Sequence, residues 1–149
     1  MDDILLFTFL FGAIMLISTA LILIGLRLHK DHRVSKPWII VVLTPSFLLL
    51  VLFWSLAIHM RHTLGGWPSG IGFSELEGSL LFHAQVATEF FVRFGEFSIL
   101  IWPAYCMVSA IVPRLRTSLL YAGLYSVGFS IVTVLMLTAP SGFQRWWWD

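Results

Sequence analysis

The chain contains few charged residues and only one cysteine. Of its 149 residues, 11% are charged, whereas an ordinary soluble domain carries about 25%. The net charge at pH 7 is +1, and no extended basic face is present, which argues against nucleic-acid binding. Cys106 is the single cysteine, so an intrachain disulfide and a cysteine-based metal cluster are excluded.

Apolar residues occupy most of the chain and leave no room for a separate soluble domain. They make up 58% of the sequence, and about 20 consecutive apolar residues suffice to cross a hydrocarbon core of about 30 Å. We therefore predict an all-α membrane protein, a bundle of four transmembrane helices forming one domain over residues 1–149. The predicted spans are about Ile4–Leu28, Trp38–His59, Arg93–Val112 and Ser118–Ala139.

The third span is preceded by a further helical segment. Ser74–Glu77 matches the S-x-x-E capping box that starts helices. A helix from Glu75 to Val112 would be roughly 57 Å long, nearly twice the thickness of the bilayer core. We therefore expect Glu75–Val92 to form an outer helix at the membrane interface, with a bend at Gly95 or Pro103.

Small residues and prolines indicate where helices start, bend and pack. Ser35 and Pro37 are typical of a helix start, and Pro45 should kink the second span. Close helix contacts are expected at small residues, among them Gly25 in the first span and Ala122, Ser126 and Ser130 in the fourth.

The distribution of basic residues predicts the orientation in the membrane. Short loops rich in Lys and Arg stay on the cytoplasmic side. The first and third loops together hold six basic residues: Arg27, Lys30, Arg33, Lys36, Arg114 and Arg116. The other side holds Arg61 and Arg145, with Arg93 near the outer boundary. Both termini are therefore expected on the extracytoplasmic side.

Four polar residues form a stripe on the predicted third helix. Gln85, Glu89, Arg93 and Glu96 fall within roughly 80° of arc at 100° per residue. Glu89 and Arg93 are spaced i, i+4, and Arg93 and Glu96 i, i+3, as in ion pairs on a helix. The stripe must face protein, water or headgroups. In the first interpretation the stripe is structural: its charges pair with one another and it faces another span or subunit. In the second, the two carboxylates exceed the one guanidinium, and the extra carboxylate makes the stripe a site of proton or ion handling.

Histidines and tryptophans are the other candidate functional residues. Three histidines lie near the predicted outer face, where they could bind a metal or haem between helices: His59, His62 and His83. The alternative is that they are loop or interfacial histidines without a ligand. We predict no cofactor. Tryptophans are typical of membrane-interface anchors, with a protein contact as the alternative for the last three. The candidate anchors are Trp38, Trp67, Trp146, Trp147 and Trp148.

The stretch from His62 to Pro68 resembles a loop of small uncharacterised bacterial multi-span proteins. In those proteins the loop follows an aromatic-rich helix and reads leucine, glycine, a variable residue, tryptophan and proline. The corresponding residues here are Leu64-Gly65-Gly66-Trp67-Pro68. The match covers about seven residues. The resemblance implies a bacterial inner membrane and no particular activity.

No nucleophile–base arrangement is visible, so the sequence favours a protein without catalytic activity. The leading hypothesis is an integral membrane subunit or scaffold that self-associates or joins a larger membrane complex. The alternative is a small transporter or proton-handling protein that uses Glu89, Arg93 and Glu96. A redox protein with a histidine-bound haem or metal is the third hypothesis.

Overall fold

A computed structural model describes residues 16–17, 19–21, 23–25, 27, 35–68 and 72–148. Within these ranges all regular structure is helical, and none of the described residues forms a strand. Most of the predicted first span, 4–28, and most of the first basic loop, including Lys30 and Arg33, lie outside the described residues.

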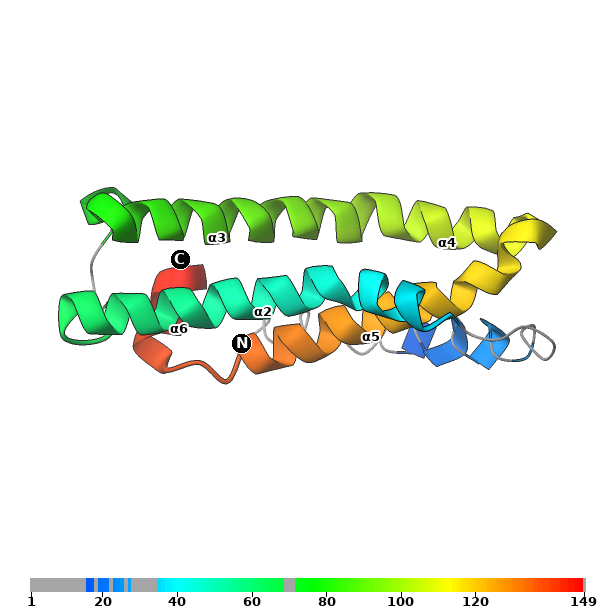
Figure 1. Cartoon of the computed structure of the whole chain (residues 1–149), viewed down its shortest axis with the longest axis horizontal. Helices are drawn as coiled ribbons and strands as arrows, with labels where there is room; N and C mark the ends of the chain where they lie inside the picture. Colours follow the sequence, from blue (N-terminus) through cyan, green and yellow to red (C-terminus); the bar gives the residue numbers. More distant parts are fainter. Residues whose placement is uncertain are drawn as a thin grey trace, which may run out of the picture.

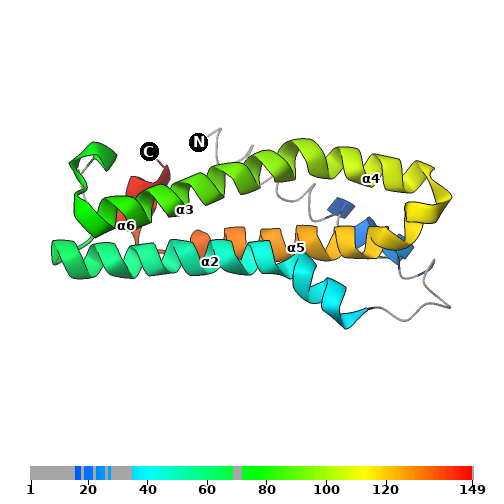
Figure 2. The same cartoon turned by 45° about the horizontal axis from the view of Figure 1, so that its top comes forward.

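Helix α2 spans Lys36–Leu64 and begins as predicted, after Ser35 and with Pro37 in its first turn. It extends five residues past the predicted end and stops at Gly65, whose positive φ of 68° is a left-handed cap that glycine adopts without strain. Its first turns (cyan) turn away from the rest of the helix in Figure 2. Pro45 lies inside α2 and cannot donate its backbone hydrogen bond, so it accounts for a bend one turn earlier.

Three consecutive helical segments form one long rod after the turn η1 (Phe73–Glu75): α3 (Gly78–Glu96), η2 (Phe97–Ile101) and α4 (Trp102–Ile111). Figure 1 shows α3 and α4 in line. The predicted capping box is wrong: α3 begins after Glu77, without a side-chain cap, and the serine at 74 belongs to the separate turn η1. The chain must first turn back toward α2, and this competes with an earlier helix start.

Helix α3 runs antiparallel to α2, and the two lie side by side in both views (Figures 1 and 2). His83 of α3 contacts His59 of α2, and farther along, Phe91 and Phe53 both contact Trp147. Residues 78–96 follow the axis of α2, and their aromatic side chains also contact α5 and α6. Whether Glu75–Val92 lies at a membrane interface stays a prediction.

Segment η2 is a turn of π-helix that precedes Pro103. The Trp102 N–H donates to the Phe97 carbonyl, five residues earlier. Pro103 has no N–H to continue the regular pattern, so a wider turn is expected just before it. The helix widens here, and although α3 and α4 look straight in Figure 1, Figure 2 shows the direction of the rod changing between them, in the region of the predicted bend.

Helix α5 (Leu119–Met136) follows the 3-10 segment η3 (Pro113–Ser118) and packs mainly on α2. Ala122, Ser126 and Ser130 are all buried, so the prediction of a close-packed small-residue face is confirmed. A Cβ at Gly128 would lie only 2.9 Å from Leu43 Cδ2 on α2. Small residues therefore set the separation of these two helices.

The chain ends in α6 (Ser141–Trp148), which follows Pro140 and folds back on the bundle. Phe143 is fully buried, with its ring 5.0 Å from that of Phe53 on α2. Trp147 contacts both Phe53 and Phe91. An aromatic cluster thus joins α2, α3 and α6 at one end of the molecule (Figure 1).

Two of the described helices, α2 and α5, are long and apolar enough to cross a membrane, by length and composition. Only 22% of the most apolar window of α2 is buried within the protein, against 50% for α5. Large apolar side chains such as Ile40, Phe47 and Ile58 are exposed on the outer surface of α2. Such a surface is suited to lipid contact.

Candidate functional site

The predicted polar stripe lies on one exposed face of α3. The Arg93 Nε donates to Glu89 Oε1 at 2.8 Å, and the Arg93 Nη1 donates to Glu96 Oε2 at 3.4 Å. The side chains of Glu89, Arg93 and Glu96 are 65%, 71% and 54% exposed, and Gln85 is exposed as well. The expectation that the stripe faces another span is not met within the described residues, where both of its ion pairs stay within α3.

The antiparallel packing places this stripe alongside the apolar middle of α2. Starting from the contact between His83 and His59, equal rises along the two helices bring Glu89 to the level of Phe53. Arg93 then lies near the level of Leu49, and Glu96 three residues farther on. The charged group therefore lies at the level of the middle of α2, a helix long and apolar enough to cross a membrane.

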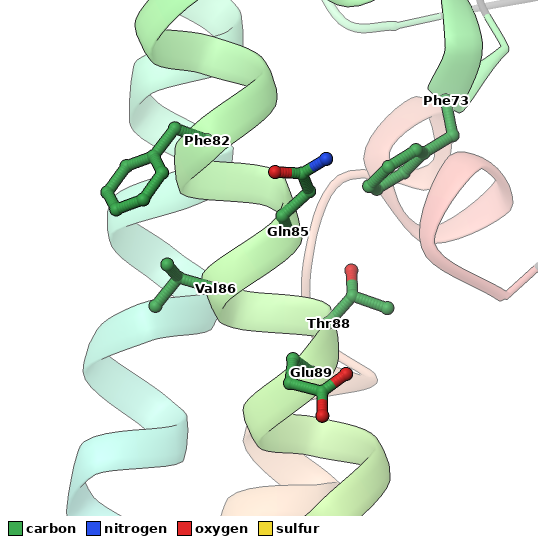
Figure 3. A pocket seen from close by; sticks show the side chains of 6 residues that line it. All are labelled: Phe73, Phe82, Gln85, Val86, Thr88 and Glu89. Atoms are coloured by element: carbon green, nitrogen blue, oxygen red, sulfur yellow. The ribbon is translucent and has the colours of Figure 1, made fainter.

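A shallow groove of about 520 Å³ runs along the same face of α3. Figure 3 shows the side chains of Gln85 and Phe73 facing each other across it, with Thr88 and Glu89 farther along the helix and with Phe82 and Val86 toward α2. One wall is the turn η1, and the floor is helix α3. The surface around the stripe therefore presents both apolar side chains and hydrogen-bonding groups.

Two of the three candidate histidines come together between α2 and α3. The Nδ1 atoms of His59 and His83 are 3.0 Å apart, and their ring centroids are 5.3 Å apart. The Nε2 of His83 is 3.0 Å from the hydroxyl of Ser55 on α2. The two rings are in contact, so a haem could not lie between them without separating the helices.

His62 does not join this pair. It is exposed and lines a second hollow with Arg61 and Trp67, where the Arg61 guanidinium lies 5.1 Å from the centre of the Trp67 ring. Among the described residues, no three histidine, cysteine, aspartate or glutamate side chains converge as a metal site would require. Of the three candidate histidines, the structure thus brings His59 and His83 together and places His62 in a different hollow.

The candidate tryptophan anchors fall into two groups. Trp38 is exposed at the start of α2, and Trp148 is exposed at the end of α6. Trp67, Trp146 and Trp147 pack against the hydrophobic core instead. An intramolecular contact therefore accounts for much of the tryptophan-rich tail, and the interface-anchor prediction does not apply to Trp147, whose indole nitrogen is buried.

Hydroxyl groups around the π-helical turn form a network that sequence reasoning missed. The Ser98 hydroxyl donates to the Phe94 carbonyl at 2.7 Å, so its oxygen accepts from the Tyr125 hydroxyl, also at 2.7 Å. The Trp102 Nε1–H donates to Ser126 Oγ at 2.9 Å. These bonds fasten η2 and α4 to α5. The proline at position 103 was the one sequence signal of a wider turn here.

Removing the acceptor of Trp102 tests this network. Ser126→Ala should lower the free energy of unfolding by about 1–3 kcal/mol, because the partly buried indole N–H loses its partner. Thr133→Ala is the matched control on α5, since Thr133 bonds only to the Phe129 carbonyl of its own helix. Denaturant titration in detergent should show a clear loss for the first variant only; equal stabilities would contradict the assignment.

Comparison with known proteins found no matching family model, no matching curated protein and no matching solved structure. The function must therefore be argued from the geometry of the chain itself.

Proposed function

We propose that this protein is a non-catalytic integral membrane subunit or scaffold, in which the exposed face of α3 binds another helix. That helix belongs to a second copy of the chain or to another subunit of a membrane complex. The proposed setting is the bacterial inner membrane, with four spans and both termini on the extracytoplasmic side.

The observation that carries this proposal is the depth of the charged stripe. If α2 crosses the membrane, its antiparallel neighbour α3 holds Glu89, Arg93 and Glu96 at the level of the hydrocarbon core. Charged side chains exposed to lipid are costly and almost always face protein or a water-filled cavity. The described residues leave all three side chains more than half exposed, and we propose that a partner helix covers them.

The pattern on this face matches a helix–helix contact. Phe82, Gln85, Glu89, Val92 and Glu96 are all exposed and are spaced alternately by three and four residues, the spacing of a coiled-coil seam. The groove beside Phe73 and Gln85 continues the same surface. A second helix laid along this seam would bury both the apolar and the polar members of the stripe.

The charge of the stripe indicates the chemistry of the partner. Two carboxylates face one guanidinium, so one negative charge per chain is left uncompensated at this depth. The partner helix is expected to supply a basic or hydrogen-bond-donating side chain, because a buried carboxylate needs such a partner.

The same excess carboxylate favours a second candidate function, proton handling. Glu96 makes the longer of the two bonds to Arg93, so it is the carboxylate that would exchange a proton. Glu96→Gln keeps the shape of the side chain but cannot take up a proton. Loss of pH-driven flux in liposomes with an unchanged fold would support this function, and unchanged flux would exclude it for Glu96.

Assembly in mild detergent tests the leading proposal. The purified protein should have a mass above the 16.9 kDa of one chain or should co-purify with another membrane protein, because the stripe needs a cover. Arg93→Glu should release the partner, because the guanidinium that pairs Glu89 and Glu96 is lost and one donor side chain of the partner cannot compensate three carboxylates. The mass is read by light scattering after size-exclusion chromatography.

Arg114→Glu is the matched control, because it reverses the charge of an exposed arginine in η3, outside α3. It should leave the assembly intact. A lone monomer for the parent protein would contradict the proposal, and so would equal assembly of the parent and Arg93→Glu.

A further inference from the structure

The contact between His59 and His83 lies away from the exposed stripe on which the proposed scaffold role rests. The two Nδ1 atoms lie 3.0 Å apart and belong to different helices, α2 and α3. Two ring nitrogens that both present lone pairs repel each other at this distance. One of them therefore carries a proton and donates it to the other in a hydrogen bond, unless a metal ion takes the place of that proton.

Ser55 determines which form His83 takes. The Ser55 hydroxyl donates its single proton to the Leu52 carbonyl at 3.1 Å. With this bond made, the Ser55 oxygen accepts from His83 at 3.0 Å, and His83 then carries its proton on Nε2. Since a neutral imidazole has only one ring proton, the Nδ1 of His83 is an unprotonated donor atom directed at His59.

We propose that the Nδ1 atoms of His59 and His83 bind one late first-row divalent metal ion of the Zn²⁺ type, which clamps α3 to α2. Imidazole nitrogen is a preferred ligand of such ions. Zn–N bonds of 2.0–2.1 Å at a tetrahedral angle place two nitrogens about 3.4 Å apart. In the metal-free pair the two nitrogens point straight at each other. To direct both lone pairs at one ion at a tetrahedral angle, each ring must turn by roughly 35°, and the nitrogens then move apart by roughly 0.4 Å.

The surroundings of the pair are those of a metal-binding histidine. A ligating imidazole usually donates its other N–H to an oxygen, which fixes both its tautomer and its orientation. Ser55 does this for His83. Both histidines are half-buried rather than sealed in the core, so an ion and its waters can reach them from the end of α2.

The protons balance when the ion binds. In the metal-free form His59 carries its proton on Nδ1, which donates to His83. On binding, that proton moves through solvent to the Nε2 of His59, and Nδ1 becomes a ligand. No net proton is released at neutral pH. Water fills the remaining positions, because no third ligand converges among the described residues, and binding is accordingly weaker than at a four-ligand structural site.

Equilibrium dialysis of the detergent-purified full chain against Zn²⁺ at pH 7.5 tests this site. One ion per chain is expected, and it should be lost in His59→Gln and in His83→Gln, which keep a polar side chain at each position. Ser55→Ala should weaken binding by tenfold or more, because it frees the His83 ring. Zn²⁺ should also raise the thermal midpoint of the parent protein but not that of His83→Gln.

His62→Gln is the matched control. His62 lies three residues after His59 on the same helix but lines a different hollow, so this variant should keep the bound ion. The proposal is overturned if the parent binds no Zn²⁺, if His83→Gln binds as well as the parent, or if His62→Gln loses the ion as well. The experiment does not depend on assembly, so it fails or succeeds independently of the scaffold role.

Discussion

Phe143→Ala should lower the free energy of unfolding by about 3–5 kcal/mol, the usual cost of truncating a buried phenylalanine. Phe143 is fully buried and meets the ring of Phe53 edge-on at 5.0 Å. It also contacts Trp146 and Trp147, so a cavity at this position would loosen the whole of α6. The loss is measured by denaturant titration in detergent, followed through the helical circular dichroism signal.

Phe82→Ala removes the same atoms from an exposed position and serves as the matched control. Phe82 is 68% exposed on α3, so in the isolated chain its truncation should change stability by no more than about 0.5 kcal/mol. If the two variants are equally stable, α6 is not docked on the bundle. That outcome would return the tail to the interface-anchor role expected from its tryptophans.

The helices were predictable from hydrophobicity and from their boundary residues. Ser35 and Pro37 do mark the start of α2, and Pro140 follows the turn that ends α5. The buried small residues of α5 were also predictable, since Ala122 and Ser126 recur at helical spacing. These features depend on local backbone preferences and on periodicity, which one sequence displays directly.

The arrangement of the helices was less predictable, because it depends on which surfaces meet. Length alone suggested that the segment before Arg93 lies along the membrane interface. In the structure, α3 lies along α2 with Ala84 and Ala87 buried, and its Phe94 packs on Tyr125 and Phe129 of α5. The same uncertainty applied to the tail: three tryptophans suit a headgroup layer as well as they suit an aromatic core, and their neighbours decide between the two.

The candidate site shows the same division. The four polar residues of α3 share a face because helical geometry requires it, so the stripe was predictable. Its level along α2 was not, since that level depends on the register between α2 and α3. The sequence placed His59, His62 and His83 near one another, and only packing shows that His59 meets His83, 24 residues away. The role of Ser55 depends on that packing and had no sequence signal.

Gly25→Ala should destabilise the protein by about 1–3 kcal/mol, the typical cost of overpacking a tight contact. A Cβ at this position would lie 2.7 Å from the backbone nitrogen of Leu120 and 2.8 Å from its Cα. Backbone atoms of a helix cannot rotate away as a flexible side chain can. The added methyl group must therefore move the segment around Gly25 away from α5.

Gly95→Ala is the control with the opposite expected sign. Gly95 lies inside α3, and a Cβ there would meet no heavy atom within 4 Å. Alanine is the better helix former by about 1 kcal/mol, so this variant should be slightly more stable than the parent protein. Denaturant titrations of the two variants should thus shift in opposite directions. A shift of Gly25→Ala toward higher stability would mean that Gly25 does not pack closely on Leu120, and the close-packing role predicted for Gly25 would then be wrong.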